Sequence, residues 1–133
     1  MKIQLNSTHI ESGVEYNEYA KKIYDNKQIV LPRNKEYVLK IDYPLQTPAK
    51  FEIKSGTKGI SRGRLVSLIR KYYQKVYDIE DRTTKVKARN IPGMLNRDFT
   101  NGKFGIWGHN IGDLVLCEAS VSKNNVITLS VDS

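Results

Sequence analysis

The segment from Ser61 to Ile79 constrains the fold of this chain more than any other. Its apolar side chains recur at intervals of three and four residues, the spacing of one face of an α-helix. These side chains are Leu65, Leu68, Ile69, Tyr72, Tyr73, Val76 and Ile79. A helix with so broad an apolar face has to pack against another layer of structure. The rest of the chain must therefore supply that layer.

Alternating apolar and polar residues predict strands on both sides of this helix. The predicted strands lie at 27–32, 36–44, 49–55, 104–108, 113–121 and 125–133. The second and third of them are expected to be a hairpin or adjacent antiparallel neighbours, and the polar "SKNN" joins the last two as a hairpin. The pattern predicts an α+β fold, with a mainly antiparallel sheet of about five to six strands and one long amphipathic helix packed on one face.

A chain of 133 residues is long enough for one domain with a hydrophobic core, so we expect a single domain over 1–133. A short helix is predicted from about Val14 to Tyr24, ahead of the first strand. Between about 82 and 103 apolar residues are few, and Pro92 and Gly93 favour irregular backbone. This segment is predicted to be a long, basic, exposed loop.

The net charge of +8 is concentrated in the middle of the chain. Residues 50–103 hold 14 Lys or Arg against five acids, a net charge of +9, and the remainder holds eight against nine, or −1. Such an asymmetry is typical of a surface that meets a polyanion. The alternative is that the basic residues only keep the protein soluble.

The leading hypothesis is a non-enzymatic basic module that binds a polyanion, foremost DNA or RNA, through backbone phosphates. The residues expected to carry this binding are Lys58, Arg62, Arg64, Arg70, Lys71, Lys75, Arg82, Lys85, Lys87 and Arg89. Nearby glycines and the helix start suggest a discrete phosphate site around Arg62 and Arg64. The opposing interpretation, which we favour for that site alone, is that these arginines are simply exposed helix formers.

Two other classes of function remain open. In the first, a protein-interaction or structural component, with a homo-oligomer as one form of it, would make contact through Tyr73, Tyr77 and Trp107, because interfaces favour aromatic residues. In the second, a small hydrolase would use His109, Asp113 and Cys117, although a cysteine in an apolar strand is usually inert. The sequence contains no recognisable metal-ligand set, and we expect neither a metal nor a cofactor.

The segments "RLVSLIRKYYQKVYDIED" and "NGKFGIWGHNIGDLVL" resemble a pattern in small proteins of large DNA viruses that infect protists. The matching positions are Tyr73, Tyr77, Glu80, Asp81, Gly105 to His109 and Asp113, whereas Asn110 stands where the pattern has Asp. The resemblance implies a viral origin and a setting in the host cytoplasm. No activity, cofactor or catalytic residue follows from it.

The chain also lacks the sequence features of membrane or secreted proteins. No apolar run reaches the roughly 18 residues that span a bilayer, and Met1–Thr8 lacks the apolar core of a secretory signal. The single cysteine, Cys117, excludes an internal disulfide. We therefore expect an intracellular protein that is not secreted and has no membrane partner.

Overall fold

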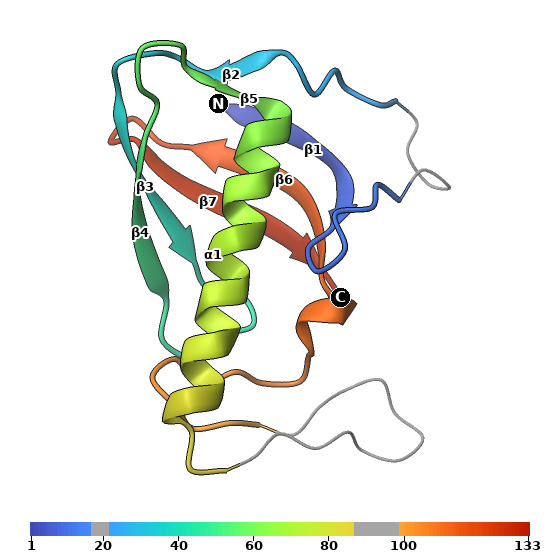
Figure 1. The fold of residues 1–133 in the computed structure, drawn as a ribbon, viewed down its shortest axis with the longest axis vertical. Coiled ribbons are helices and arrows are strands. Elements are labelled where there is room, and N and C mark those ends of the chain that lie inside the picture. Colours follow the sequence, from blue (N-terminus) through green and yellow to red (C-terminus); the bar gives the residue numbers. More distant parts are fainter. Residues whose placement is uncertain (17–21, 87–98) are drawn as a thin grey trace.

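The computed structural model describes residues 1–16, 22–86 and 99–133, which form a helix layer on a sheet layer (Figure 1). The elements, in chain order, are β1 (Lys2–His9), β2 (Ile29–Leu31), β3 (Glu36–Ile41), β4 (Ala49–Lys54), β5 (Ile60–Ser61), α1 (Arg62–Thr83), the short 3-10 helix η2 (Ile111–Asp113), β6 (Val115–Val121) and β7 (Val126–Asp132). The predicted α+β class is confirmed.

The main sheet has five strands in the order β1-β6-β7-β3-β4, and β2 and β5 form a separate two-stranded sheet. All neighbours in the main sheet are antiparallel except β3 and β7, which are parallel. Both expected strand pairs, β3 with β4 and β6 with β7, are antiparallel. The late strand β7 lies between β6 and β3, so the last strand of the chain is central to the sheet.

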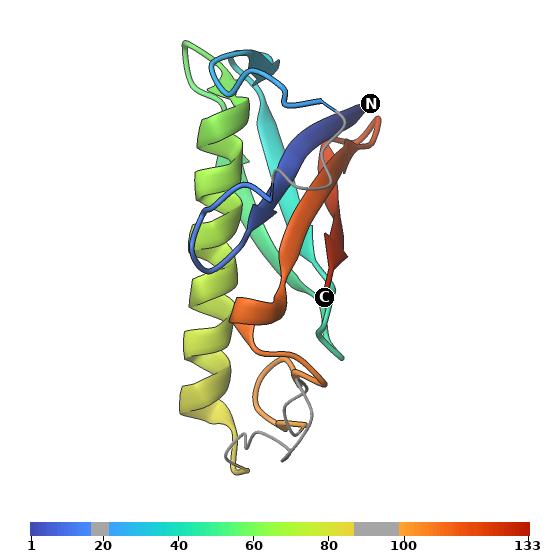
Figure 2. The ribbon, with the colours of Figure 1, turned by 90° about the vertical axis from the view of Figure 1, so that its right-hand side faces the viewer.

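Helix α1 covers one face of the main sheet, and no other described helix or strand lies over the opposite face (Figure 2). The core forms between them because every second strand residue points toward the helix. Its fully buried members include Leu5, Leu39, Ile69, Leu116 and Ile127. The apolar side chains of the strands and those of α1 therefore pack together in one layer between the sheet and the helix.

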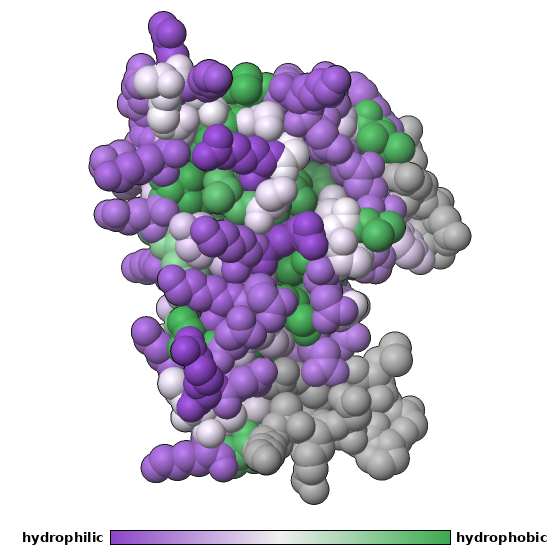
Figure 3. All heavy atoms as spheres, in the orientation of Figure 1, coloured by the Kyte–Doolittle hydropathy of each residue, from purple (hydrophilic) through white to green (hydrophobic). Residues whose placement is uncertain are grey.

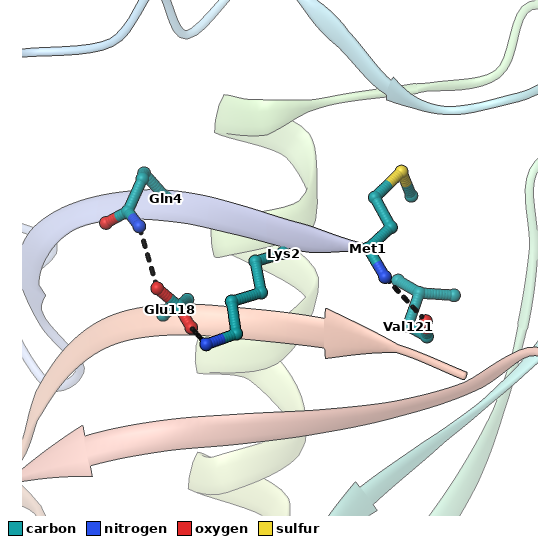
Figure 4. Close-up of polar contacts among 5 residues, drawn as sticks. All are labelled: Met1, Lys2, Gln4, Glu118 and Val121. Atoms are coloured by element: carbon teal, nitrogen blue, oxygen red, sulfur yellow. Dashed lines mark hydrogen bonds and ion pairs between the residues drawn. The ribbon is translucent and has the colours of Figure 1, made fainter.

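The uncovered face of the sheet is polar and carries charges of both signs. At its β1 edge the Glu118 carboxylate accepts a hydrogen bond from Gln4 Nε2 at 2.7 Å and lies 3.9 Å from Lys2 Nζ (Figure 4). Lys40 and Lys50 are directly opposite each other on β3 and β4, with their side chains on this same face. We call this surface the open face.

Three predictions of local structure were wrong. Strand β1 was not predicted, and residues 104–108 form no strand, making only a single antiparallel bridge between Leu45 and Ile106. The described parts of the expected helix at 14–24, residues 14–16 and 22–24, are not helical. Within the described residues, no helix has the length and apolar character needed to cross a membrane.

A candidate nucleic-acid interface on the helix layer

The two arginines at the start of α1 have different environments. Arg62 is buried, with 5% of its surface exposed, and its guanidinium donates to the backbone carbonyls of Gln4, at 2.7 Å, and Asp25. The same group lies over the Tyr24 ring, 5.2 Å from its centroid. Arg62 therefore connects β1 and the segment before β2 to the helix. Because it is buried, it is not part of the predicted binding surface.

Arg64 remains on that surface. Its side chain is exposed, while its backbone N–H donates to the hydroxyl of Ser61, which caps the helix at 3.2 Å. The cap supplies an uncharged oxygen to the first turn, where free N–H groups otherwise lack partners. The discrete phosphate site considered at the helix start loses its buried arginine. The opposing interpretation, an exposed helix former, fits Arg64 but not Arg62, which is a buried structural contact.

Arg70 is also used within the fold. Its Nε donates to the carbonyl of Ile10 at 2.8 Å, and one terminal nitrogen donates to the carbonyl of Glu11 at 3.0 Å. A Cβ added to Gly13 would lie 2.5 Å from this guanidinium, so the turn after β1 closes directly over it. Arg70 is a half-buried anchor on the flank of α1 that faces β1.

Four predicted cations form a row along the outer side of α1, which we call the helix stripe: Arg64, Lys71, Lys75 and Arg82. All four are exposed. Their spacings of seven, four and seven residues bring them to one line on a helix. Within the described residues no ion pair involves a member of the stripe. Figure 3 shows hydrophilic residues over most of this face, with apolar residues in separate patches beside them.

An aromatic pair lies beside the middle of the stripe. The rings of Phe51, on the edge strand β4, and Tyr72 are stacked with centroids 4.4 Å apart and an interplanar angle of 22°. Lys71 Nζ lies 5.8 Å from the Tyr72 centroid, and Lys75 Nζ lies 5.8 Å from that of Phe51. Because the two half-buried rings cover each other, they hold the helix against β4 and leave the ammonium groups at the surface.

Acids moderate the charge of this face without cancelling it. Two acids, Asp78 and Asp81, are exposed on α1, compared with the four cations of the stripe. The Asp78 carboxylate accepts a hydrogen bond from Gln74, and its backbone carbonyl accepts one from Arg82 Nε at 3.4 Å. The N-terminal three quarters of the stripe are therefore the more electropositive part.

Past the end of α1 the structure describes part of the predicted basic loop. Lys85 is exposed, and its backbone N–H donates to Asn101 Oδ1 at 3.0 Å. The Thr84 hydroxyl accepts a hydrogen bond from the backbone N–H of Asn101 at 3.1 Å, so the two sides of the loop are joined at its base. Lys87 and Arg89 lie outside the described residues.

The segment was predicted to be an exposed loop, but Thr100 near its end is buried because this part of the chain packs around Glu80. Glu80, on α1, is fully buried. Its carboxylate accepts hydrogen bonds from the Thr100 hydroxyl at 2.6 Å and from four backbone N–H groups: Gly102 at 2.9 Å, Phe104 at 2.9 Å, Gly105 at 3.2 Å and Ile106 at 3.4 Å. Burial alone would raise the pKa of Glu80, but the hydrogen bonds from Thr100 and the loop outweigh it and hold the pKa below its ordinary value.

The aromatic contact residues predicted from sequence separate into two groups. Tyr73 and Tyr77 are buried, and their hydroxyls donate to the backbone carbonyls of Tyr43, at 2.8 Å, and His109, at 3.0 Å. Burial raises the pKa of Tyr73. Neither tyrosine can meet a partner at the surface. Trp107 is 43% exposed and meets Tyr43 edge to face, with centroids 5.5 Å apart.

The three residues of the hydrolase hypothesis do not form a catalytic set. The Asp113 carboxylate accepts a hydrogen bond from the backbone N–H of Asn110 at 3.0 Å and so caps η2. Cys117 Sγ lies 3.5 Å from Asp132 Oδ2, and burial, followed by the charge of Asp132, raises the pKa of the thiol. No described hydrogen bond links either residue to the His109 ring, which lies beside Tyr43 and Trp107.

A raised thiol pKa disfavours the reactive thiolate, so the chemistry of Cys117 opposes a nucleophilic role. In the described part of the chain, no group of three or more His, Cys, Asp or Glu side chains is arranged to hold a metal ion. The polar groups of this corner are instead used to shape the backbone between α1 and β6.

Two cations that the sequence interpretation left out lie close to Lys58. Arg33 and Lys35 are exposed in the connection from β2 to β3, and Lys58 is exposed in the connection from β4 to β5. We call these three residues the turn cluster. Hydrogen bonds between the two connections bring them together, and such long-range pairing of two turns leaves no local signal in a sequence.

Comparison of the chain with protein-family models, with curated proteins and with solved structures finds no match. The function must therefore be argued from the surface itself.

Proposed function

We propose that this protein is a non-enzymatic module that binds nucleic acid through backbone phosphates, with the helix stripe as its central contact. The observation that carries the proposal is the alignment of four exposed cations, free of ion pairs within the described residues, along one side of α1. Cations on a rigid element neutralise phosphates and release their counterions, which favours binding at low salt.

The distribution of charge over the two faces supports the same proposal. The open face mixes signs: Lys2, Lys40 and Lys50 lie there with Glu52 and Glu118. The stripe side keeps an excess of cations over Asp78 and Asp81. A polyanion is attracted to the side where the excess is, so the helix layer rather than the open face is the binding surface.

The test is a comparison of two variants with the same loss of charge. R64Q/K71Q/K75Q removes three cations of the stripe, and K2Q/K40Q/K50Q removes three lysines of the open face. Both sets are at the surface, so both variants should unfold cooperatively, as urea denaturation will check. Binding of each protein to a labelled 16-base-pair duplex of mixed sequence is measured by fluorescence anisotropy between 50 and 200 mM KCl.

We expect the stripe variant to bind at least about tenfold more weakly at 100 mM KCl and to lose about 3 from the slope of log affinity against log salt, because each lost phosphate contact removes about 0.9. The open-face variant should keep most of the slope. Absence of salt-dependent binding by the unmodified protein, or equal losses in the two variants, would contradict the proposal.

A further inference from the structure

The turn cluster lies at the end of the molecule where α1 begins. Both views place the connection between β4 and β5 beyond the first turn of the helix, and in Figure 2 it lies on the helix side of the sheet. Lys58 in this connection and Arg64 in α1 are separated by five residues, 59–63, which include the short strand β5. The turn cluster therefore lies at the same end of the molecule as the N-terminal end of the helix stripe, on the side of β3 and β4.

Hydrogen bonds hold the two connections in fixed positions. The backbone N–H of Asn34 donates to the carbonyl of Gly56 at 2.7 Å, and that of Ser55 donates to the carbonyl of Lys35 at 2.9 Å. The Ser55 hydroxyl accepts a further hydrogen bond from the N–H of Lys35 at 2.9 Å. The backbone of the cluster thus needs little ordering when a ligand binds.

The charge of the cluster is not cancelled nearby in the two turns. Residues 32–35 and 55–58 contain no acid. The acid that follows them, Glu36, lies 3.8 Å from Lys54 Nζ and is thereby paired with a lysine outside the cluster. Gly59 allows the close approach of the two connections, because a Cβ at this position would lie 2.6 Å from the carbonyl oxygen of Leu31.

This surface lacks the aromatic platform on which single strands are bound. The exposed aromatic side chains among the described residues are Tyr16, Phe99 and Trp107, and none of them belongs to α1 or to the two turns. Tyr72 on α1 is half-buried, and one face of its ring is covered by Phe51. Proteins that bind single strands depend on base stacking worth about 1–3 kcal/mol per base.

We infer that the ligand is a nucleic-acid duplex, held by the helix stripe and the turn cluster together; this inference rests on the proposed function. A duplex presents phosphates at fixed positions and at a density of about one charge per 1.7 Å of axis. A rigid row of cations engages them without ordering the ligand. A single strand would have to be ordered along the same row with no stacking to compensate.

The length of the surface sets the size of the ligand. From Arg64 to Arg82 the stripe rises by about 27 Å, which corresponds to roughly eight base pairs. The turn cluster adds to this length at the N-terminal end. With seven cations in contact, the slope of log affinity against log salt for the unmodified protein should be about −6.

The deciding variant is R33Q/K35Q/K58Q, which removes the turn cluster and leaves the stripe intact. Its matched control is again K2Q/K40Q/K50Q. Each protein is titrated against four labelled probes of matched sequence: a DNA duplex and an RNA duplex of 16 base pairs, and a DNA strand and an RNA strand of 16 nucleotides. The RNA and DNA duplexes share the phosphate chemistry of the proposed ligand, and the two arms show which of them is preferred.

We expect at least one duplex to bind about tenfold more tightly than the matching single strand at 100 mM KCl, and the turn-cluster variant to lose about 3 from the slope on that duplex. Equal or tighter binding of single strands would overturn the inference. So would an unchanged slope in the turn-cluster variant while the stripe variant R64Q/K71Q/K75Q still binds weakly; the proposed function would then stand without the cluster. Failure of the unmodified protein to bind any of the probes would overturn the proposed function itself.

Discussion

At the scale of single residues, Glu80 organises the end of the helix layer. Its two carboxylate oxygens share five hydrogen bonds from the loop at 100–106, with two on Oε1 and three on Oε2. In Glu80→Gln one of these oxygens becomes an NH₂ group that points at two or more N–H or O–H donors, whichever way the amide is turned. Buried donors that face one another have no acceptor, and the protein loses stability by the desolvation free energy of each group left unpaired.

We expect Glu80→Gln to lower the free energy of unfolding by about 3 kcal/mol in urea denaturation, with an unchanged dependence on urea concentration. Asp78→Asn, at an exposed acid of the same helix, is the control and should change it by less than about 0.5 kcal/mol. Similar small effects of the two substitutions would show that the loop does not depend on the carboxylate.

The same pair of variants gives a pH dependence whose sign follows from the lowered pKa of Glu80. The folded state binds the proton less readily than the unfolded state, so this stabilisation is fully present above the ordinary pKa of 4.5 and is lost as the pH falls through the folded-state pKa. The difference between the unmodified protein and Glu80→Gln should be constant from pH 7 to about 5.5 and shrink below 4.5. A difference that already shrinks between pH 7 and 5.5 would indicate a raised pKa instead.

The sequence alone did not reveal this role of Glu80. Glu80 follows Tyr73 by seven residues and Val76 by four, which places it on the apolar face, but an acid in the last turns of a helix is normally solvated. Only the return of the chain at 100–106, some 20 residues later, encloses it. The run of glycines there, Gly102 and Gly105, was a usable signal, because glycine allows the backbone to turn its N–H groups toward one point.

At the scale of elements, the start of α1 places two arginines in opposite roles. Arg62→Met removes hydrogen bonds to two backbone carbonyls and leaves them without this donor, so it should lower the free energy of unfolding by about 2 kcal/mol. Arg64→Met, at an exposed position, should change stability by less than about 0.5 kcal/mol. On duplex probes the order is reversed: Arg64→Met should lose about 1 from the salt slope.

Folded Arg62→Met should keep the salt slope of the unmodified protein, measured at a temperature at which circular dichroism shows it to be native. Weaker salt dependence in Arg62→Met than in Arg64→Met would contradict the assignment. The contrast is a sharp one because the two positions are separated only by Gly63 and differ mainly in burial.

Elements with an uninterrupted period were the most predictable. The helix, β3, β4 and β7 each follow one period along most of their length, and β6 was predicted in spite of a register shift between Leu116 and Glu118. In β1 the alternation of Ile3 and Leu5 ends at a register shift, where Asn6 and Ser7 have φ of 59° and 46°. Residues 104–108 have strand-like composition, yet Gly105 and Gly108 have positive φ and the chain instead bends around Glu80.

At the scale of the whole molecule, only some of the cations on the proposed binding surface could be identified from the sequence. The basic segment at 50–103 includes the four cations of the helix stripe, whose alignment follows from helical spacing, a local property. It also included Arg62 and Arg70, whose burial depends on contacts with β1, and omitted Arg33 and Lys35, which lie beside Lys58 only after folding. Side-chain burial and turn pairing are tertiary properties that composition does not report.

An excess of +8 on one small molecule has a further consequence, because like charges repel each other in the compact state. The ion pairs found among the described residues, Lys2 with Glu118 and Lys54 with Glu36, each involve an exposed lysine, so screening them removes little stability. We therefore expect salt to act in opposite directions on folding and on binding: raising KCl from 20 to 200 mM should increase the free energy of unfolding while it weakens duplex binding. The stripe variant R64Q/K71Q/K75Q, with three fewer positive charges, should show a smaller gain in stability over the same range. Stability that falls with KCl in the unmodified protein would mean that attractive pairs outweigh the repulsion between the cations, and would contradict this prediction.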